Sequence, residues 1–273
     1  MFSGLPLHEA LCRLHAYGWR AFDVSADHLT AIEVDASPDR RIEEAQRCLC
    51  ELSISAPQAH AYLRADVAAS NAAERQRNVQ RLLRHTEIAA QLGVRTVVIH
   101  PGGRYDDPAR LEPERIRSLN VEAFRRLADH AAERNVRIGI ENMGWRRDPT
   151  NLALLLELLE AIDHPVVGIA LDTSHVNMIG LDVAGAVRAS GRSLVATHLS
   201  DNDGSADQHR TPGYGTIDWP AAMAAFREIE YHGALSLEIS EPHHPVPALQ
   251  EFKMRFALEV AEWLVALATP GDS

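Results

Sequence analysis

Short apolar runs alternate with longer amphipathic stretches along most of this chain. Most of the runs are continuously apolar rather than alternating, which is typical of parallel strands that are buried on both faces. The predicted strands are Arg20–Ser25, Leu52–Pro57, Arg95–His100, Val136–Glu141, Val166–Leu171, Leu194–Leu199 and Ala234–Ile239.

The stretches between these runs carry helix signals at their ends. Ser37 and Pro38 supply an N-cap and a first-turn proline, and Gly93 is a suitable residue to follow the end of a helix. The predicted helices are Leu7–Tyr17, Pro38–Glu51, Ala73–Leu92, Pro113–Arg134, Thr150–Ile162, one from Trp219 to about Gly233, and Pro247–Leu267.

Repeated strand–helix units without a linker favour a closed α/β barrel, the (β/α)₈ TIM barrel, built as one domain over residues 1–273. One strand of the eight is not found. It would precede the helix at Leu7–Tyr17, where only six residues are left, so we expect a short or missing first strand. A doubly wound open sheet is the alternative fold.

Composition narrows the function classes. The chain has 273 residues and a formal net charge of −11, which argues against a nucleic-acid partner because such proteins need a basic surface. No run of about 18 apolar residues is present and the first residues lack a basic start, so we expect neither a membrane span nor a signal peptide. The sparse cysteines, Cys12, Cys48 and Cys50, favour a reducing cytoplasm over a disulfide framework.

Ionisable residues gather where the predicted strands end. The last five strands end at or near His100, Glu141, Asp172, His198 and Glu238. Any one of these has an ordinary explanation as a polar loop residue. A closed barrel points all of them toward one axis, where the carboxylates would repel each other and some of their pKa values would rise. A bound divalent cation removes that penalty, so the pattern predicts a metal site.

Mixed carboxylate and imidazole ligands suit Zn, Mn, Co or Fe(II) better than calcium. The predicted primary ligands are Glu141, Asp172, His198 and Glu238. A second group could bind further ions or hold substrate hydroxyls or a phosphate: His60, His100, His175, Asp207, His209 and Arg210. The polar run Asp201–Asp203 is expected to be a solvated loop.

At these residues the sequence resembles the xylose-isomerase-like TIM-barrel superfamily, which holds sugar and sugar-phosphate isomerases and epimerases and the endonuclease IV type of nuclease. The matching segments are VVIHPGG (97–103), IGIENM (138–143), LDTSHVNM (171–178), THLSDNDG (197–204), DQHRTPGYGTIDW (207–219) and LSLEIS (235–240). The resemblance implies one divalent metal held by the primary set, with Glu141 and Glu238 as the acid–base pair. In the nuclease branch, it implies three zinc ions held by nine residues, for all of which this chain has counterparts.

Three functions follow as hypotheses. The favoured one is a metal-dependent isomerase or epimerase of a small polyhydroxylated carbonyl compound, phosphorylated or not, acting through a metal-stabilised enediolate. The second is an endonuclease IV-like phosphodiester hydrolase with two or three metals, which the acidic charge balance disfavours. The third is a metal-bound scaffold or sugar-binding module without catalysis. A homodimer is compatible with the resemblance.

Overall fold

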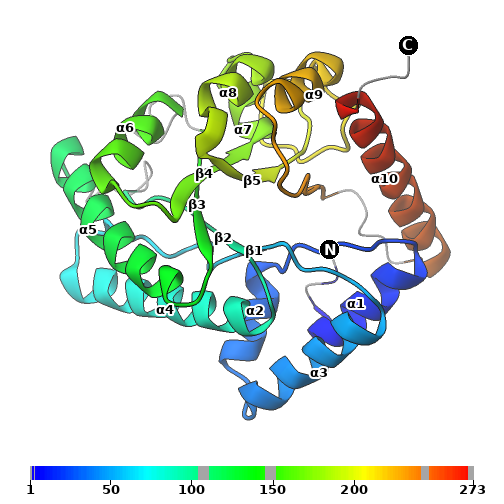
Figure 1. Ribbon diagram of the computed structural model, residues 1–273, viewed down its shortest axis with the longest axis horizontal. Coiled ribbons are helices and arrows are strands. Elements are labelled where there is room, and N and C mark those ends of the chain that lie inside the picture. Colours follow the sequence, from blue (N-terminus) through cyan, green and yellow to red (C-terminus); the bar gives the residue numbers. More distant parts are fainter. Residues whose placement is uncertain (1, 3, 104–110, 145–151, 241–245, 270–273) are drawn as a thin grey trace.

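The computed structural model describes residues 2, 4–103, 111–144, 152–240 and 246–269. Its centre is a parallel five-stranded sheet whose strands follow one another in chain order (Figure 1). The strands are β1 (Gln58–His60), β2 (Thr96–Ile99), β3 (Arg137–Glu141), β4 (Val167–Asp172) and β5 (Leu194–His198).

Single backbone bridges continue this sheet at both edges. Ala21 and Val24 pair in parallel with Ser55 and Ala59 beside β1, and Leu237 pairs in parallel with Leu199 beyond β5. The curved wall therefore runs in sequence order from residues 20–25 to residues 234–239. A doubly wound sheet would reverse its strand order near the middle, so the unbroken order confirms the TIM-barrel prediction.

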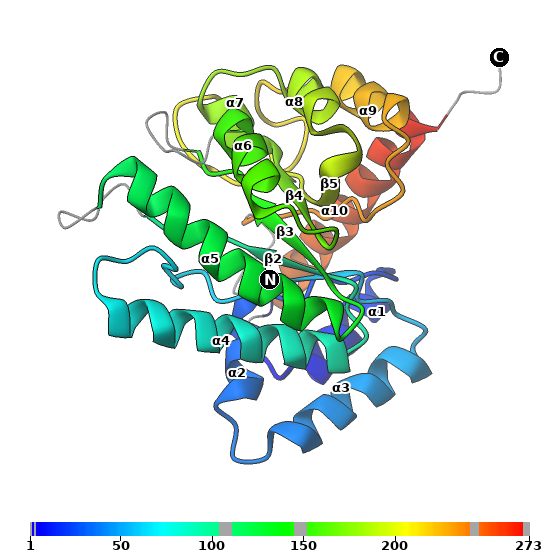
Figure 2. The same ribbon diagram turned by 60° about the vertical axis from the view of Figure 1, so that its left-hand side comes forward.

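Helices cover the outer face of this wall (Figures 1 and 2). The described helices are α1 (Leu7–Ala16), α2 (Ala26–Glu33), α3 (Pro38–Glu51), α4 (Ala72–Gln91), α5 (Pro113–Ala132), α6 (Leu152–Ile162), α7 (Thr173–Met178), α8 (Val183–Ser190), the 3₁₀ turn η1 (Gly191–Ser193), α9 (Trp219–Glu228) and α10 (Pro247–Ala268). The short α7 lies at the mouth of the barrel rather than outside the wall, since its His175 and Met178 line the cavity there. The long helices lie where they were predicted, although the predicted start at Thr150 lies outside the described residues.

Three short helices were not predicted from the sequence. The helices α2, α7 and α8 have only 8, 6 and 8 residues, too few to display a clear hydrophobic period. Each begins at an N-cap residue whose side-chain oxygen accepts a hydrogen bond from a backbone N–H of the first turn, and these residues are Ser25, Asp172 and Asp182 respectively. Capping rather than amphipathicity is the local signal that marks them.

The predicted strand at Leu52–Pro57 is displaced. Leu52 caps the end of α3, Ser53 has a left-handed φ of 53°, and the ladder of β1 begins only at Gln58. The predicted strands at residues 20–25 and 234–239 exist only as isolated bridges. Among the described residues no strand precedes α1, in agreement with the expectation of a short or missing first strand.

Two layers of apolar side chains flank the wall. The outer layer lies between sheet and helices and includes Phe124 and Leu82. The layer inside the barrel is small and consists of Val98, Ala170 and Ala196. Gly139 belongs to the same layer, because a Cβ there would lie 3.0 Å from the Cβ of Ala170. The thin inner layer leaves the space above it to the polar side chains at the strand ends.

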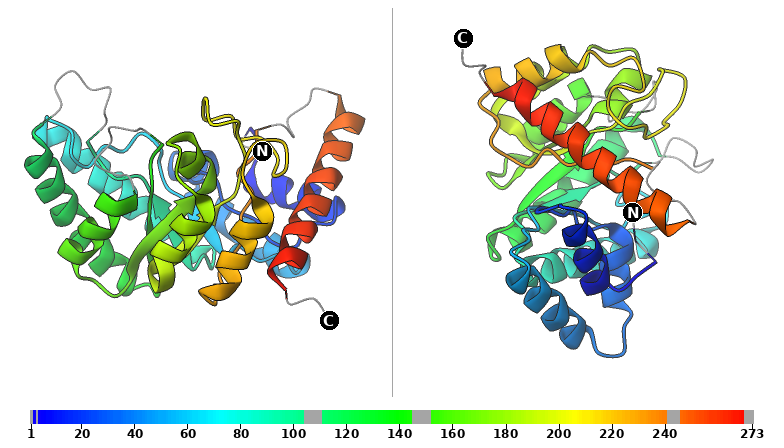
Figure 3. Two further views of the ribbon diagram at one scale, coloured as in Figure 1. Left: turned by 90° about the horizontal axis from the view of Figure 1, so that it is seen from above. Right: turned by 90° about the vertical axis from the view of Figure 1, so that its right-hand side faces the viewer.

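The edges at residues 20–25 and 234–239 face each other across what we call the seam. Ser236 Oγ donates to Asp23 Oδ2 across it at 3.0 Å. Beside this contact lies a cavity of about 310 Å³ whose lining includes residues of both edges. Trp19 Nε1 donates to the carbonyl oxygen of Met254, which ties α10 alongside the N-terminal helices (Figure 3). No helix in the described part of the chain has the length and apolar character needed to cross a membrane.

Candidate metal centre

Strand alternation explains why the ionisable residues meet. Successive side chains of a strand point to opposite faces, so residues two apart share a face. Val98, Gly139, Ala170 and Ala196 fill the barrel interior, and the residues two positions later therefore face the same interior at its carboxyl-terminal end. Those residues are His100, Glu141, Asp172 and His198.

The four residues predicted as primary ligands form one cluster. Glu141, Asp172, His198 and Glu238 each offer a ligand atom, and these atoms all lie within 4.8 Å of one another. His198 Nδ1 lies 2.9 Å from Glu141 Oε1 and 3.2 Å from Glu238 Oε2. Glu141, Asp172 and His198 are at most 3% exposed, whereas the side chain of Glu238 is 40% exposed.

Glu141 is the centre of the cluster. Its Oε2 lies 3.0 Å from both His60 Nε2 and His100 Nε2, while its Oε1 faces His198. Burial alone would raise the pKa of Glu141, but the three imidazoles hold it well below its usual value. Burial likewise opposes a charge on His198, yet Glu238 and Glu141 raise its pKa well above the usual value. The three imidazoles around Glu141 thus offset the cost of burying its carboxylate.

Asp172 differs from Glu141 because one of its oxygens is not satisfied. Oδ1 accepts the backbone N–H of His175 at 2.8 Å, while Oδ2 is buried without a hydrogen-bond partner. Burial and the neighbouring carboxylates raise the pKa of Asp172 to about 6. A buried carboxylate oxygen that lacks a hydrogen-bond partner and lies in a cluster of His and Glu side chains is typical of a ligand to a cation.

The second predicted group lies around this cluster in two sets. In the first set, His60, His100 and Glu141 each offer a ligand atom, and these three atoms also lie within 4.8 Å of one another. The other set is joined through one oxygen, since Asp207 Oδ2 lies 3.3 Å from His175 Nε2 and 2.9 Å from His209 Nε2. Hydrogen bonding to Asp207 raises the pKa of His209 to about 9.

A cavity of about 710 Å³ opens onto the cluster at the mouth of the barrel. Its ionisable lining residues are His100, Glu141, His175, Asp207, His209 and Glu238. Leu63, Met143 and Met178 supply an apolar wall. Arg210 is not part of this lining, because its guanidinium donates to Asp203 at 3.0 Å and to the carbonyl oxygen of Tyr214 at 3.2 Å.

Several residues that hydrogen-bond to the metal-centre residues or lie beside them were not predicted from the sequence. Asn142 binds Asp172 in both directions, accepting its N–H at 2.7 Å and donating to its carbonyl oxygen at 3.1 Å. Gln58 and Asp23 lie beneath His198, where Gln58 Nε2 donates to Asp23 Oδ2 at 2.6 Å. Strand parity could have found Gln58, which is two residues before His60, but no sequence signal marks Asp23.

The prediction of a solvated loop at Asp201–Asp203 is wrong for its first two residues. Asp201 and Asn202 are 0% exposed. Asp201 accepts hydrogen bonds from Trp219 Nε1 and from the backbone N–H groups of Gly213 and Ile217. Buried carboxylates require such donors, and here they fold the segment that carries Asp207 and His209 back onto the barrel mouth.

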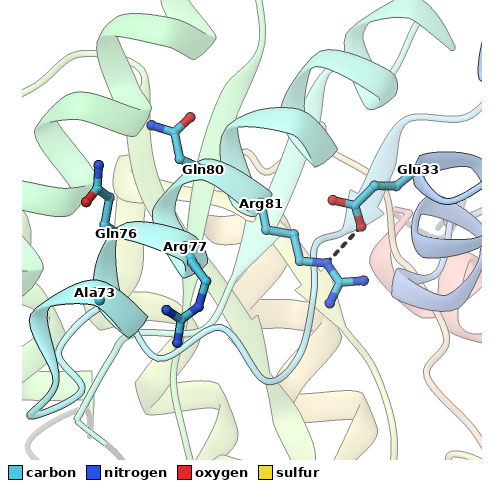
Figure 4. A pocket seen from close by; sticks show the side chains of 6 residues that line it. All are labelled: Glu33, Ala73, Gln76, Arg77, Gln80 and Arg81. Atoms are coloured by element: carbon cyan, nitrogen blue, oxygen red, sulfur yellow. Dashed lines mark hydrogen bonds and ion pairs between the residues drawn. The ribbon is translucent and has the colours of Figure 1, made fainter.

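A further pocket, of about 570 Å³, lies on the outside of the barrel (Figure 4). It is lined by α4 side chains and by Glu33, which accepts from Arg81 Nε at 2.8 Å. Arg77 and its neighbours on α4 are exposed and do not converge on a buried acceptor or donor. The pocket lacks the buried ionisable cluster of the barrel mouth.

Comparison with known proteins agrees with this geometry. A family model described as xylose isomerase-like TIM barrel matches residues 12–259. An inosose isomerase of Bacillus subtilis is 26% identical over 165 residues, 58% of each chain, and an L-ribulose 3-epimerase of a Methylomonas species is 31% identical over 139 residues, 50% of this chain and 46% of that protein. The matched part spans about half the length of such curated relatives. A crystal structure of D-psicose 3-epimerase superposes with a TM-score of 0.81 at 18% identity, covering 98% of this chain and 96% of that one.

Proposed function

Because the chain belongs to the xylose isomerase-like TIM-barrel family, we propose that it is a divalent-metal-dependent isomerase or epimerase of a small polyhydroxylated carbonyl compound. One observation carries the proposal: Glu141, Asp172, His198 and Glu238 bring four ligand atoms within 4.8 Å of one another at the floor of an open cavity. Fold alone would not support a function, since the same barrel hosts many.

The residues present fit a divalent cation. Three carboxylates and one imidazole are ligands that Zn, Mn and Co accept. The buried Oδ2 of Asp172 has no hydrogen-bond partner, and a cation would offset the burial and the carboxylate repulsion that together raise the pKa of this group. The same cation would supply positive charge beside Glu141, whose pKa the three neighbouring imidazoles lower.

Proton transfer falls to the two glutamates in this proposal. When bound, the ion would polarise the substrate carbonyl and offset the charge of the enediolate. One of Glu141 and Glu238 removes the proton next to the carbonyl, and the other returns it. Both line the mouth cavity, as the transfer requires. A placed carboxylate contributes about 10²–10⁴-fold to such a step.

The substrate class follows from the cavity and the relatives together. Two of the relatives are named as 3-epimerases of the ketoses ribulose and psicose, and a third as an isomerase of inosose. Among the described residues that line the mouth, none is Lys or Arg. We therefore propose a sugar or cyclitol ketone as the substrate, with His175 and His209 as partners for its hydroxyl groups.

Metal analysis and a deuterium-exchange assay test the proposal together. We expect one divalent ion per chain and, in deuterium oxide, enzyme-dependent incorporation of deuterium next to the carbonyl of at least one unphosphorylated ketose, seen by NMR. The exchange should vanish after chelation and return on adding Mn²⁺ or Co²⁺. Metal-loaded protein without exchange on a broad panel of ketoses and inososes would contradict the proposal.

A second candidate function rests on the two additional histidine sets. His60 and His100 beside Glu141, and His175 and His209 beside Asp207, complete the nine residues that resemble a three-zinc hydrolase site. Three zinc ions per chain and cleavage of an abasic-site duplex would favour it. The single domain over residues 1–273, the cytoplasmic location and the homodimer stay predictions.

A further inference from the structure

Asp23 lies on one edge of the seam and is joined to three surrounding side chains through a single oxygen. Its Oδ2 accepts from Gln58 Nε2 at 2.6 Å, from Ser236 Oγ at 3.0 Å and from His198 Nε2 at 3.3 Å. Ser236 comes from the opposite edge of the seam, and His198 belongs to the primary cluster. The Asp23 carboxylate therefore contacts both the opposite edge of the seam, through Ser236, and the proposed metal centre, through His198.

The two nitrogens of His198 face different partners. Nδ1 faces Glu141 and Glu238, within the cluster, whereas Nε2 faces Asp23. An imidazole nitrogen binds a metal only when it carries no proton, so a ligating Nδ1 requires the proton on Nε2. A hydrogen bond from Nε2 to a carboxylate is the usual way in which proteins impose that tautomer.

We propose that Asp23 is a positioning residue of the metal centre: it holds the proton of His198 on Nε2 and so presents Nδ1 to the ion. The inference rests on the proposed function, because it assigns a task to a ligand of that site. Asp23 is not one of the four primary residues, and residues 20–25 contribute none of those four.

The surroundings of Asp23 fit this task better than a purely structural one. Gln58 is fixed by a second bond, from its Nε2 to the carbonyl oxygen of Thr197 at 3.0 Å. Ser236 is fixed through its N–H, which donates to Thr197 Oγ1 at 3.2 Å. The shorter of the two bonds to Asp23, from Gln58 at 2.6 Å, sets the orientation of Oδ2 toward His198, whereas the bond from Ser236 at 3.0 Å joins the two edges of the seam.

The unsatisfied oxygen of the Asp23 carboxylate also supports a positioning role. Its Oδ1 is buried without a hydrogen-bond partner, an arrangement that costs free energy. A neutral side chain could join Ser236 and Gln58 without that cost. Closure of the seam alone does not account for a buried carboxylate oxygen without a partner at this position.

Zn²⁺ affinity, measured by chelator competition, tests the inference in three variants. We expect Asp23→Ala to raise the Zn²⁺ dissociation constant by about 10–100-fold. Asp23→Asn should fall between Asp23→Ala and the wild type, because its amide oxygen still accepts but carries no charge. Ser236→Ala is the matched control, since it removes a bond across the seam and leaves the contact with His198. Its dissociation constant should stay close to that of the wild type.

Ring ¹⁵N NMR of His198 gives the second readout. In the Zn²⁺-loaded wild type the proton should reside on Nε2, and in Asp23→Ala the Nε2 signal should lose the signature of its hydrogen bond. A purely structural Asp23 would lower the unfolding temperature of Asp23→Ala and Ser236→Ala alike, with wild-type Zn²⁺ affinity in both, and that result overturns the inference. If Asp23→Ala does not fold, Asp23→Asn decides, and an unchanged dissociation constant overturns it. A wild type that binds no Zn²⁺ overturns the proposed function as well.

Discussion

The barrel wall has two regions that are held together differently. The arc from β1 to β5 is a continuous ladder of backbone pairs, whereas the described segments that flank the seam attach to it by isolated bridges and meet through Asp23 and Ser236. Three members of the primary cluster come from the arc and are almost fully buried. Glu238 comes from the seam edge, and its side chain is 40% exposed. The arc thus pre-organises most of the site, while the seam supplies its least constrained member.

The largest effect should come from breaking the centre of the arc. Glu141→Gln removes the charge on which His60, His100 and His198 converge, so we expect turnover to fall by at least about 10²–10⁴-fold, with loss of bound metal. Glu238→Gln should also lose turnover but retain more metal, because it sits on the less constrained edge. Metal analysis and the exchange assay measure both. Glu133→Gln, on an exposed helix end, is the matched control.

Equal metal loss in Glu141→Gln and Glu238→Gln would contradict the difference between arc and seam. Near-normal turnover in both would remove the acid–base assignment itself, whatever the metal content.

A pH effect is expected on the seam side. His28 of α2 is 1% exposed, and burial lowers its pKa from 6.5 to about 4. Between these values the unfolded chain binds a proton that the folded protein does not, so stability falls as the pH falls through this window, by up to about 3 kcal/mol. Denaturant unfolding of His28→Leu at pH 7 and pH 4 should show a smaller drop than the wild type. An identical drop would contradict the role of His28.

Metal binding should stabilise the seam edge at residues 234–239 more than the arc. A divalent ion at one hundred times its dissociation constant stabilises the folded protein by about 2.7 kcal/mol. Because that ion would join Glu238 to ligands of the arc, hydrogen exchange should slow more in residues 234–239 than in β3. Exchange mass spectrometry with and without Mn²⁺ measures this. Equal protection of both segments would show that the seam is already as well held as the arc.

The smallest effect is expected in the outer pocket of Figure 4. Arg77 is exposed there and belongs to no buried cluster. Arg77→Ala should leave turnover and metal content unchanged and alter unfolding free energy by no more than about 0.5 kcal/mol. Loss of activity in this variant would move the functional site away from the barrel mouth.

Prediction from sequence succeeded where the signal is local and repeated. The apolar runs at β2 to β5 are buried on both faces, so their composition alone marks them as strands of a parallel sheet. It failed at Leu52–Pro57, because this segment, which forms the turn after α3 and the link to β1, also contains several apolar residues. The short helices were missed because capping residues, not periodicity, define them.

The site shows the same division. His100, Glu141, Asp172 and His198 could be predicted because each stands at or directly after the end of an apolar run, and strand parity places them on one face. Asn142 and Gln58 stand beside or two residues before such positions and could have been included. Asp201 was misjudged as solvated because its partners, Trp219 among them, are brought to it only by the folded loop.

The amino-acid sequence by itself determined the strand–helix rhythm and the ionisable residue at the end of each inner strand, because both are written in short stretches of neighbouring residues. Only the tertiary structure decided which of those residues share a cluster, that the two edges of the wall meet at a side-chain contact, and that Asp23 lies against His198. These contacts join segments that are far apart in the sequence, up to 213 positions for Asp23 and Ser236. They depend on how the barrel closes rather than on any local pattern.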